Sequence, residues 1–399
     1  KKAKEKGYTV DVSALLKLDN ERRELMGKIE ALRAERNKLA DALKGGNPSE
    51  EQLNRGREVK EQIVQSEALL NPISDSFDRL LQDIPNLHFD DVPVGGENDS
   101  QEIKQVGEKS SGAKDHLDFA HERDWLDFER GAKVAGAKFY FLKGDLALLE
   151  NALIQFALEF VTGKDFKLLR VPQLVNSRTA AGSGFAPRTS EQSDEYFVEG
   201  EDLSLIATSE IPITGFHADE TIEESELPLK YAGISTCYRK EAGSYGKHAR
   251  GLFRVHQFEK LEMYAFCLPE ESQKIHEELL KIEEELWQAL DVPYRVISVA
   301  SGDLGAPAAK KYDIEYWSSV DKKYRELTSC SNCTDYQARN MNIRVKRKDG
   351  TVEVLHTLNA TAVASVRSLI AVLEHYQTKD GKLKIPKVLQ KYMGGKEIL

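Results

Sequence analysis

The sequence predicts an α+β protein in which an N-terminal antiparallel coiled-coil arm precedes a domain of mixed strands and helices. Three observations predict this fold. Heptad-spaced apolar residues run through a charged N-terminal stretch, and strand-like and helix-like stretches alternate from about residue 115 onward. Neither GxGxxG nor GxxxxGK[ST] occurs, so the chain carries no dinucleotide-binding or P-loop signature. A length of 399 residues accommodates two domains.

The predicted arm covers about residues 13–84, where charged residues dominate and glycine and aromatic residues are scarce. In its first half, leucines recur every seven residues, at Leu18, Leu25, Leu32 and Leu39. In its second half, a ladder with alternating steps of four and three residues comprises Val59, Ile63, Ser66, Leu70, Ile73, Phe77, Leu80 and Ile84. Such steps form the seam of a coiled coil, so each half is predicted to be one long helix.

The two helices are predicted to be antiparallel because only the short Gly/Pro-containing stretch 44–48 separates them. Ser49 and Gln52 predict the start of the second helix, and Pro72 predicts a kink or an end within it. An arm of this kind fits a dimerisation or spacer element. Residues 22–60, with ten Lys/Arg against seven Asp/Glu, show only a weak basic excess that would favour RNA binding.

Composition and charge narrow the class of protein. Apolar residues make up 40% of the chain and charged residues 31%, and no apolar run reaches the ~18 residues that a membrane helix needs. With no signal-peptide pattern at its start, the chain is expected to be cytoplasmic. The net charge of −10 argues against nucleic-acid binding over the whole surface but allows a local basic groove. Cys330 and Cys333 form a CxxC pair without a second pair at metal-binding spacing, so no zinc is expected.

A turn-rich, apolar-poor linker is predicted at about residues 85–115. The arm with its linker is assigned to residues 1–100 and the second domain to residues 101–399. In the second domain, Leu146–Val161 and Pro269–Leu290 are predicted to be amphipathic helices. Strands are predicted at Lys167–Val171, Ser204–Ala207, Phe253–Phe266, Pro293–Val299 and Val352–Leu358.

The most informative stretch is YRKEAGSYGKHARGLFRVHQFEKLEM, residues 238–263, which is predicted to be a strand hairpin. Side chains of equal parity share one face of a strand, so Arg239 and Glu241 are expected to point the same way. On the second strand, one polar face is expected to comprise Arg254, His256, Phe258, Lys260 and Glu262. The connection at 242–252 is rich in glycine and basic residues and is expected to be mobile.

These residue types suit a pocket that holds a nucleotide and an amine. The Arg239 guanidinium can bind two phosphate oxygens at once, and Glu241 can accept a hydrogen bond from a base amine. Phe258 can stack on a purine, and the Glu262 carboxylate can hold an ammonium group. The alternative is a solvated outer sheet face, on which cross-strand Arg–Glu pairs are ordinary. Periodicity by itself leaves both interpretations open.

The stretch resembles motif 2 of class II aminoacyl-tRNA synthetases, in the form found in seryl-tRNA synthetases. Other segments of that family follow the same order: DFERGAKVAGAKFYFLKGDLALLENAL at 127–153, ATSEIPI at 207–213, GDLGAPAAKKYDIEYW at 302–317, YRELTSCSNCTDYQARN at 324–340, LNATAVASVRSLIAVLEHYQ at 358–377 and IPKVLQKYMGGKEI at 385–398. The similarity covers nearly the whole chain. It implies a class II antiparallel sheet flanked by helices, preceded by a tRNA-binding arm.

The resemblance also implies the site residues. Catalysis would depend on Arg239 and Arg367. Serine would be bound by Thr208, Ser209, Glu210, Arg239, Glu262, Asn359 and Thr361. ATP would be bound by Arg239, Lys240, Glu241, Arg254, Phe258, Glu326, Leu327, Thr328, Ser329 and Arg367. Mg²⁺ would be held with ATP by Glu326 and Ser329, which strict strand alternation places on opposite faces, so a bend is expected between them.

The implied activity is that of a homodimeric ligase, which activates L-serine with ATP as seryl-adenylate and transfers it to tRNA(Ser), with tRNA(Sec) as a further candidate. Ala360, Ala362 and Val366 stand where many bacterial members have glycine. In this respect the chain resembles archaeal and eukaryotic members. Cys330 and Cys333 belong to the family's SCSNC run. Two alternatives stay open, a ligase that delivers its amino acid to a carrier protein and a catalytically silent RNA-binding relative.

Overall fold

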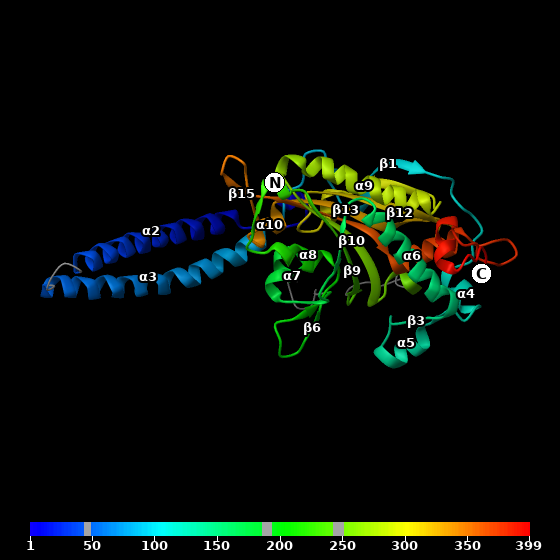
Figure 1. The fold of residues 1–399 in the computed structure, drawn as a ribbon, viewed down its shortest axis with the longest axis horizontal. Helices are drawn as coiled ribbons and strands as arrows, with labels where there is room; N and C mark the ends of the chain where they lie inside the picture. The colour runs from blue at the N-terminus through cyan, green and yellow to red at the C-terminus, as the bar shows by residue number, and fades with distance from the viewer. Residues whose placement is uncertain (44–48, 186–193, 242–250) are drawn as a thin grey trace. The chain divides into compact units, whose positions relative to one another are not determined.

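The computed structural model describes residues 1–43, 49–185, 194–241 and 251–399 (Figure 1). The chain divides into two compact units. One comprises the arm, residues 7–85, together with Lys1 and Ala3, and the other comprises residues 86–399 together with Lys2 and residues 4–6. The predicted turn at 44–48 and most of the predicted connection at 242–252 lie outside the described residues.

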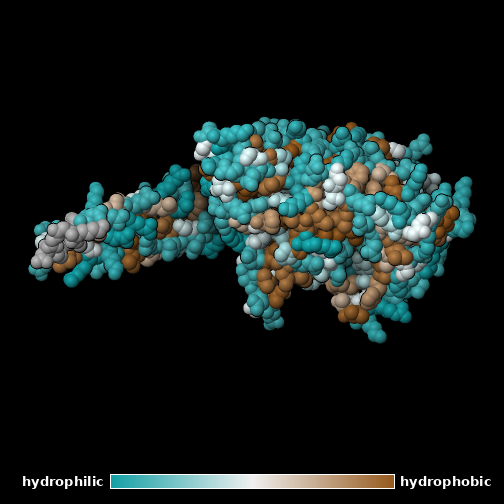
Figure 2. All heavy atoms as spheres, viewed as in Figure 1, coloured by the Kyte–Doolittle hydropathy of each residue, from teal (hydrophilic) through white to brown (hydrophobic). Residues whose placement is uncertain are grey.

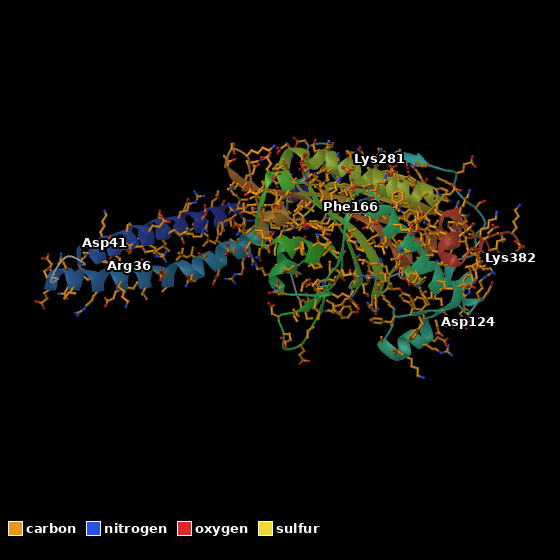
Figure 3. The ribbon with its side chains drawn as sticks, in the orientation of Figure 1. Arg36, Asp41, Asp124, Phe166, Lys281 and Lys382 are labelled. Atoms are coloured by element: carbon orange, nitrogen blue, oxygen red, sulfur yellow. The ribbon has the colours of Figure 1, made fainter. Side chains whose placement is uncertain are left out.

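The arm consists of α2 (Val12–Leu43) and α3 (Glu50–Gln82), which confirms the predicted helix pair. Its apolar seam is buried at the ladder positions Leu32, Val59 and Ile63. Ion pairs join Arg33 to Glu67 at 2.8 Å and Arg55 to Glu35 at 2.7 Å. Along α2, Arg33 pairs with Glu67 of α3, and the later residue Glu35 pairs with the earlier Arg55 of α3. The two helices are therefore antiparallel. Arg36 and Asp41 of α2, labelled in Figure 3, are exposed, and hydrophilic side chains cover most of the arm's visible face (Figure 2).

The start of α3 has the predicted cap. The Gln52 backbone N–H donates to Ser49 Oγ at 3.2 Å, and the Ser49 N–H donates to Gln52 Oε1 at 3.0 Å. Pro72, in contrast, does not end the helix, which continues to Gln82. Beyond Pro72 the helix is still held against α2, where the Arg22 guanidinium lies 4.3 Å from the Phe77 ring centroid. Such contacts compensate for the one backbone hydrogen bond that proline cannot donate.

The larger unit is built on an eight-stranded sheet in the order β1-β11-β12-β13-β16-β10-β9-β4. These strands are β1 (Gln101–Val106), β4 (Lys167–Arg170), β9 (Leu229–Tyr238), β10 (Gln257–Cys267), β11 (Tyr294–Ser298), β12 (Lys310–Ser318), β13 (Lys323–Thr334) and β16 (His356–Ala364). Neighbours are antiparallel except β4, which runs parallel to β9. The expected antiparallel sheet is therefore confirmed.

Three shorter sheets complete the strands. They contain β2 (Leu126–Asp127) and β3 (Phe141–Leu142), then β5 (Leu174–Val175), β6 (Tyr196–Phe197) and β7 (Ser204–Leu205), and finally β8 (Thr221–Glu223), β14 (Arg344–Lys346) and β15 (Val352–Val354). The single strand predicted at Val352–Leu358 is thus two strands. It divides at the buried Leu355, because β15 pairs with β14 whereas β16 enters the large sheet.

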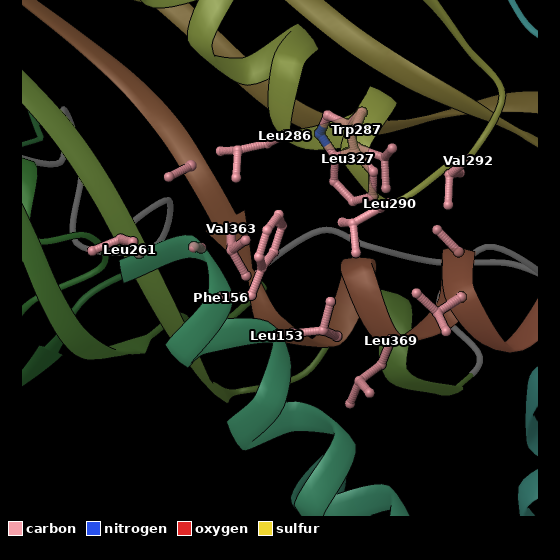
Figure 4. Close-up of a cluster of buried hydrophobic side chains, with 14 of the residues drawn as sticks. Leu153, Phe156, Leu261, Leu286, Trp287, Leu290, Val292, Leu327, Val363 and Leu369 are labelled. Carbon is pink, nitrogen blue, oxygen red and sulfur yellow. The ribbon is translucent and has the colours of Figure 1, made fainter. Parts of the chain in front are cut away.

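One face of the large sheet is covered by three helices, α6 (Gly144–Thr162), α9 (Ser272–Ala289) and α11 (Ser365–His375). Figure 4 shows Phe156, Trp287 and Leu369 of these helices around Val363 of β16, and this cluster is the main hydrophobic core. The other helices are α1 (Lys2–Glu5), α4 (His116–His121), α5 (Phe128–Ala135), α7 (Ser177–Ser183), α8 (Glu210–Thr214) and α10 (Tyr336–Asn340). Within the described part of the chain, every helix is too short or too polar to cross a membrane.

Candidate active site

The polar face of the large sheet lies opposite the three helices. Leu261 and Met263 of β10 are fully buried in the core, so Glu262 between them points to the other face. Glu262 pairs across the sheet with Thr361 of β16. A cavity at this face is lined by Arg239, Glu241, Phe253, Val255, Phe258, Lys260, Glu326, Leu327, Thr361, Ala364, Val366 and Arg367. Many of the residues named by the resemblance therefore meet here.

The predicted hairpin is wrong in one respect. β9 ends at Tyr238 and β10 begins at Gln257, so four of the predicted polar residues lie beyond the strands: Arg239, Glu241, Arg254 and His256. Glu241 adopts a left-handed backbone with φ 50°, and a 3₁₀ turn occupies Gly251–Phe253. These conformations interrupt the extended geometry on which strand parity depends. Specific contacts, and not alternation, place these side chains.

Those contacts still bring most of the predicted nucleotide-binding residues together. Arg239 Nε donates to the Ala207 carbonyl at 3.3 Å, and the guanidinium lies 5.3 Å from the Phe258 ring centroid. Arg254 Nη1 pairs with Glu241 Oε2 at 2.7 Å. Lys240 lies between Arg239 and Glu241 in the chain, and its backbone N–H donates to the Asp194 carbonyl at 2.8 Å. A guanidinium beside an aromatic ring suits a phosphate and a flat base.

Glu262 is the most enclosed charge of the site, with 1% of its surface exposed. It forms an ion pair with Lys260, and the Thr361 hydroxyl lies 3.4 Å from Glu262 Oε2. Lys260 Nζ also donates to Thr208 Oγ1 at 3.3 Å. A buried carboxylate needs a cationic partner, and an ammonium group of a ligand could share or replace that partner.

Glu210 and Asn359 meet beside this centre. Asn359 Nδ2 donates to Glu210 Oε1 at 2.8 Å, and Gln337 Nε2 donates to the same oxygen at 2.7 Å. Burial, followed by the negative charge of Glu262, raises the pKa of Glu210 to about 7. The predicted residue Ser209 faces the backbone instead, since its hydroxyl donates to the Gly233 carbonyl at 2.9 Å. Its side chain therefore supports the strand β9.

The bend expected between Glu326 and Ser329 is a β-bulge. In the pairing of β12 with β13, Ile314 lies opposite Thr328, but the next residue of β12 lies opposite Glu326, so Leu327 is the extra residue. The bulge puts Glu326 and Ser329 on the same face, as expected. Thr328 points to the opposite, core-facing side together with the buried Ile314. Only its backbone could therefore reach a ligand on the polar face.

Arg367, on the first turn of α11, completes the arrangement. Its Nη1 lies 2.9 Å from Glu326 Oε1. Burial would raise the pKa of Glu326, but the positive charges of Arg367, Lys311 and Arg239 outweigh it and lower the pKa to about 2. The site thus holds an ionised carboxylate among three cations. Such a cluster fits a polyphosphate with its metal ion better than a packed core.

Sequence reasoning gave no role to three residues of this network. Lys260 was predicted to lie on the polar face, but its ion pair with Glu262 was not predicted. Nothing in the strand pattern around Lys311 indicated that it belongs to the site. Gln337 lies on the short helix α10, which is too short for the spacing of its apolar residues to predict how it packs on the sheet. All four cysteines are buried. Across the described ranges, no group of three or more His, Cys, Asp and Glu side chains could hold a metal ion.

Comparisons with known proteins place the chain in a class. The model of the tRNA synthetase class II core domain (G, H, P, S and T) matches residues 195–376. The model of the seryl-tRNA synthetase N-terminal domain matches residues 1–88. Together with the antiparallel sheet and its polar face, these matches define a class II aminoacyl-tRNA synthetase.

Full-length relatives narrow the assignment. The chain is 46% identical to a serine–tRNA ligase of Dictyoglomus thermophilum, over 97% of this chain and 92% of that one. It is 40% identical to seryl-tRNA synthetase of Pyrococcus horikoshii, solved in complex with ATP, with a TM-score of 0.87 over 97% and 92% of the two chains. A cytoplasmic serine–tRNA ligase of Naegleria fowleri, solved with AMP, is 34% identical, with a TM-score of 0.82 and the same coverage. The chain belongs to the seryl-tRNA synthetase family, and its activity is that of a serine–tRNA ligase.

Proposed function

We propose that the polar face of the large sheet is the site where serine and ATP form seryl-adenylate. The observation that carries this proposal is the enclosed Glu262, which lies next to Thr361 and beside a cavity lined by Arg239 and Arg367. Glu262 takes the ammonium group of serine, an exchange of partners with Lys260. Relatives solved with ATP and with AMP support nucleotide binding by this chain.

The proposed roles follow from charge and contact. Arg239 holds the α-phosphate and orients the serine carboxylate toward it, while Arg367 neutralises the γ-phosphate. Phe258 and Arg254 flank the adenine, and Glu241 accepts from its exocyclic amine. Thr208, Glu210 and Asn359 complete the amino-acid side. The serine carboxylate then attacks the α-phosphate, the bond between the α- and β-phosphates breaks, and pyrophosphate leaves. This step needs positioning and charge neutralisation by these residues, without a side-chain base.

Glu326 and Ser329 would hold Mg²⁺ together with the phosphates. The chemistry of the donors fits this ion, because Glu326 has a pKa of about 2 and is ionised, and the bulge brings Ser329 to the same face. Mg²⁺ is usually held by only one or two protein oxygens plus substrate phosphates. When bound, the ion would neutralise charge on the phosphates. Arg367, now paired with Glu326, would turn to the γ-phosphate.

Selectivity for serine would depend on its hydroxyl. The Thr361 hydroxyl is the best-placed group to hydrogen-bond it, and alanine in the same pocket would leave that polar group unpaired. A site of this kind discriminates strongly against an analogue that lacks the hydroxyl. Threonine must be excluded by shape, for lack of room for its extra methyl group.

The arm is proposed to guide tRNA(Ser), with tRNA(Sec) as a further candidate, into the active site of the other subunit of a homodimer. The match of residues 1–88 to the seryl-tRNA synthetase N-terminal domain supports this role. Binding would rely on the RNA backbone and shape, so affinity is expected to fall as the salt concentration rises.

Amino-acid-dependent ATP–pyrophosphate exchange tests the proposed site. Serine is expected to support exchange at least about 100-fold more efficiently than alanine or glycine, since each loses the hydroxyl contact. Threonine should also be rejected. More efficient exchange with any of these three than with serine would refute the assignment of the amino-acid pocket.

A further inference from the structure

A second pocket adjoins the polar face on the amino-acid side. It is lined by Gly184, Phe185, Glu210, Leu304, Gly305, Ala306, Pro307, Ala308, Ser329, Ser331, Cys333 and Asn359. Three of these residues belong to the proposed serine and Mg²⁺ sites, namely Glu210, Asn359 and Ser329. The loop 304–308 forms one wall of the pocket. As far as the described residues show, this lining shares no residue with the cavity that contains Arg239 and Arg367.

Lys6 binds the backbone of this loop. The side chain is buried, with 3% of the residue exposed, and Nζ donates to the carbonyl oxygens of Ala308 at 2.8 Å and Ala306 at 3.2 Å. A third hydrogen bond, at 2.9 Å, goes to the Asn86 carbonyl. One ammonium group thus satisfies three backbone carbonyls with its three donors. Burial of a lysine costs free energy unless its donors are satisfied, so Lys6 is held in this position by its three carbonyl partners.

Asn86 binds the same loop through both its backbone and its side chain. Its backbone N–H donates to the Ala306 carbonyl at 2.9 Å. Its side-chain Nδ2 donates to the Pro307 carbonyl at 2.8 Å and to the Cys333 carbonyl at 2.7 Å. The amide therefore ties the loop to the end of strand β13. Cys333 itself lines the pocket and lies 3.6 Å, Sγ to Nδ2, from Asn359.

The segment that precedes the loop is held by the same two parts of the chain. Ser301 Oγ donates to the Glu5 carbonyl at 2.7 Å, and the Gly302 N–H donates to the Gly95 carbonyl at 2.8 Å. No side chain could replace the glycine without displacing this segment, because a Cβ on Gly302 would lie 2.6 Å from the Gly95 oxygen. Lys6 immediately precedes the arm in the sequence, and Asn86 immediately follows it.

We propose that Lys6 and Asn86 are positioning residues that hold the loop 304–308 as a wall of the serine pocket. The proposal rests on the proposed function, since it assumes that Glu210 and Asn359 face bound serine. Neither Lys6 nor Asn86 touches the substrate. Each fixes backbone carbonyls whose displacement would widen the pocket beside Glu210 and Asn359, whereas the cavity that contains Arg239 and Arg367 shares none of this lining. The two residues that flank the arm in the sequence would thus share one anchor with the amino-acid pocket.

Steady-state pyrophosphate exchange in the full-length protein tests this assignment. Asn86→Ala and Lys6→Met are each expected to raise the KM for serine at least tenfold while the KM for ATP changes less than twofold. Lys6→Arg, which keeps a charged donor, should recover most of the loss. Asn86→Asp is a milder variant, with the same size but without the Nδ2 donors, and serves if Asn86→Ala does not fold. Lys4→Met, on the exposed side of the short helix α1, is the matched control and should behave as the wild type.

The outcomes separate the two proposals. Equal increases in the KM for serine and for ATP, or a serine KM within twofold of wild type in folded Asn86 and Lys6 variants, would overturn the positioning role. Absence of serine-dependent exchange in the wild-type protein would instead refute the proposed function. Melting temperatures of all variants show whether each one is folded.

Discussion

Glu283 of α9 shows how far a single side chain depends on its surroundings. It is fully buried beneath the sheet, and in the described structure neither carboxyl oxygen makes a hydrogen bond of normal geometry. Burial raises its pKa well above the ordinary value of 4.5, and the negative charges of Glu262 and Asp313 raise it further. A carboxyl group in this position is protonated in the folded protein at pH values where it is ionised in the unfolded chain.

The sign of the resulting pH dependence is fixed by this raised pKa. Between pH 4.5 and the folded pKa the folded state binds the extra proton, so the free energy of unfolding falls as the pH rises. Glu283→Gln has the same shape and does not titrate. Its free energy of unfolding relative to that of the wild type is therefore expected to grow between pH 5 and pH 8. The growth is about 1.4 kcal/mol per pH unit at pH values below the folded-state pKa of Glu283. Thermal or urea unfolding at several pH values measures this difference.

Glu285→Gln provides the matched control, because Glu285 is half-exposed on the same helix and pairs with Lys164 at 2.6 Å. It should show no such growth. A Glu283→Gln variant whose stability difference stays constant from pH 5 to pH 8 would show that Glu283 is ionised in the folded protein.

At the scale of the element, regular apolar periodicity predicted the helices, whereas strand ends and bulges could not be predicted from the pattern of one strand. The heptads predicted α2 and α3, and amphipathic patterns predicted α6 and α9. Strand alternation failed where the strands ended: Arg239 and Arg254 lie beyond β9 and β10, in backbone that no parity governs. A bend between Glu326 and Ser329 was predicted only because the family resemblance required them to share a face, and its form, a bulge at Leu327, was not predicted. Bulges and strand ends depend on pairing across the sheet, which one strand's sequence does not contain.

The arm is expected to act in charging and not in activation. Replacement of residues 13–84 by a short glycine-serine linker should leave serine-dependent pyrophosphate exchange within about threefold of wild type, because Lys6, Asn86 and the whole polar face are retained. The same variant should lose aminoacylation of tRNA(Ser) by at least 100-fold, since affinity for tRNA depends on contacts to its backbone. Parallel exchange and charging assays measure the two effects. If charging survives, the arm is not the tRNA reader.

At the scale of the whole molecule, the ordered motifs were enough to predict the class and the substrate, whereas composition predicted little. A net charge of −10 gives no hint of the proposed polyphosphate site, because the cations Arg239, Lys311 and Arg367 are gathered locally. Contacts between distant segments that lie outside the motifs escaped prediction. Lys6 and Ala306 are 300 residues apart and meet through backbone carbonyls, which are the same in every residue type.

Serine activation in the proposed mechanism depends above all on charge neutralisation by Arg239 on the polar face. Pyrophosphate exchange of Arg239→Ala, at saturating serine and ATP, measures this dependence. We expect a fall of at least about 100-fold, the order observed when one donor to developing charge is removed. The melting temperature should be unchanged, and Arg344→Ala, at an exposed arginine outside the site, should keep wild-type activity. A folded Arg239→Ala protein that exchanges pyrophosphate at close to the wild-type rate would be incompatible with this mechanism.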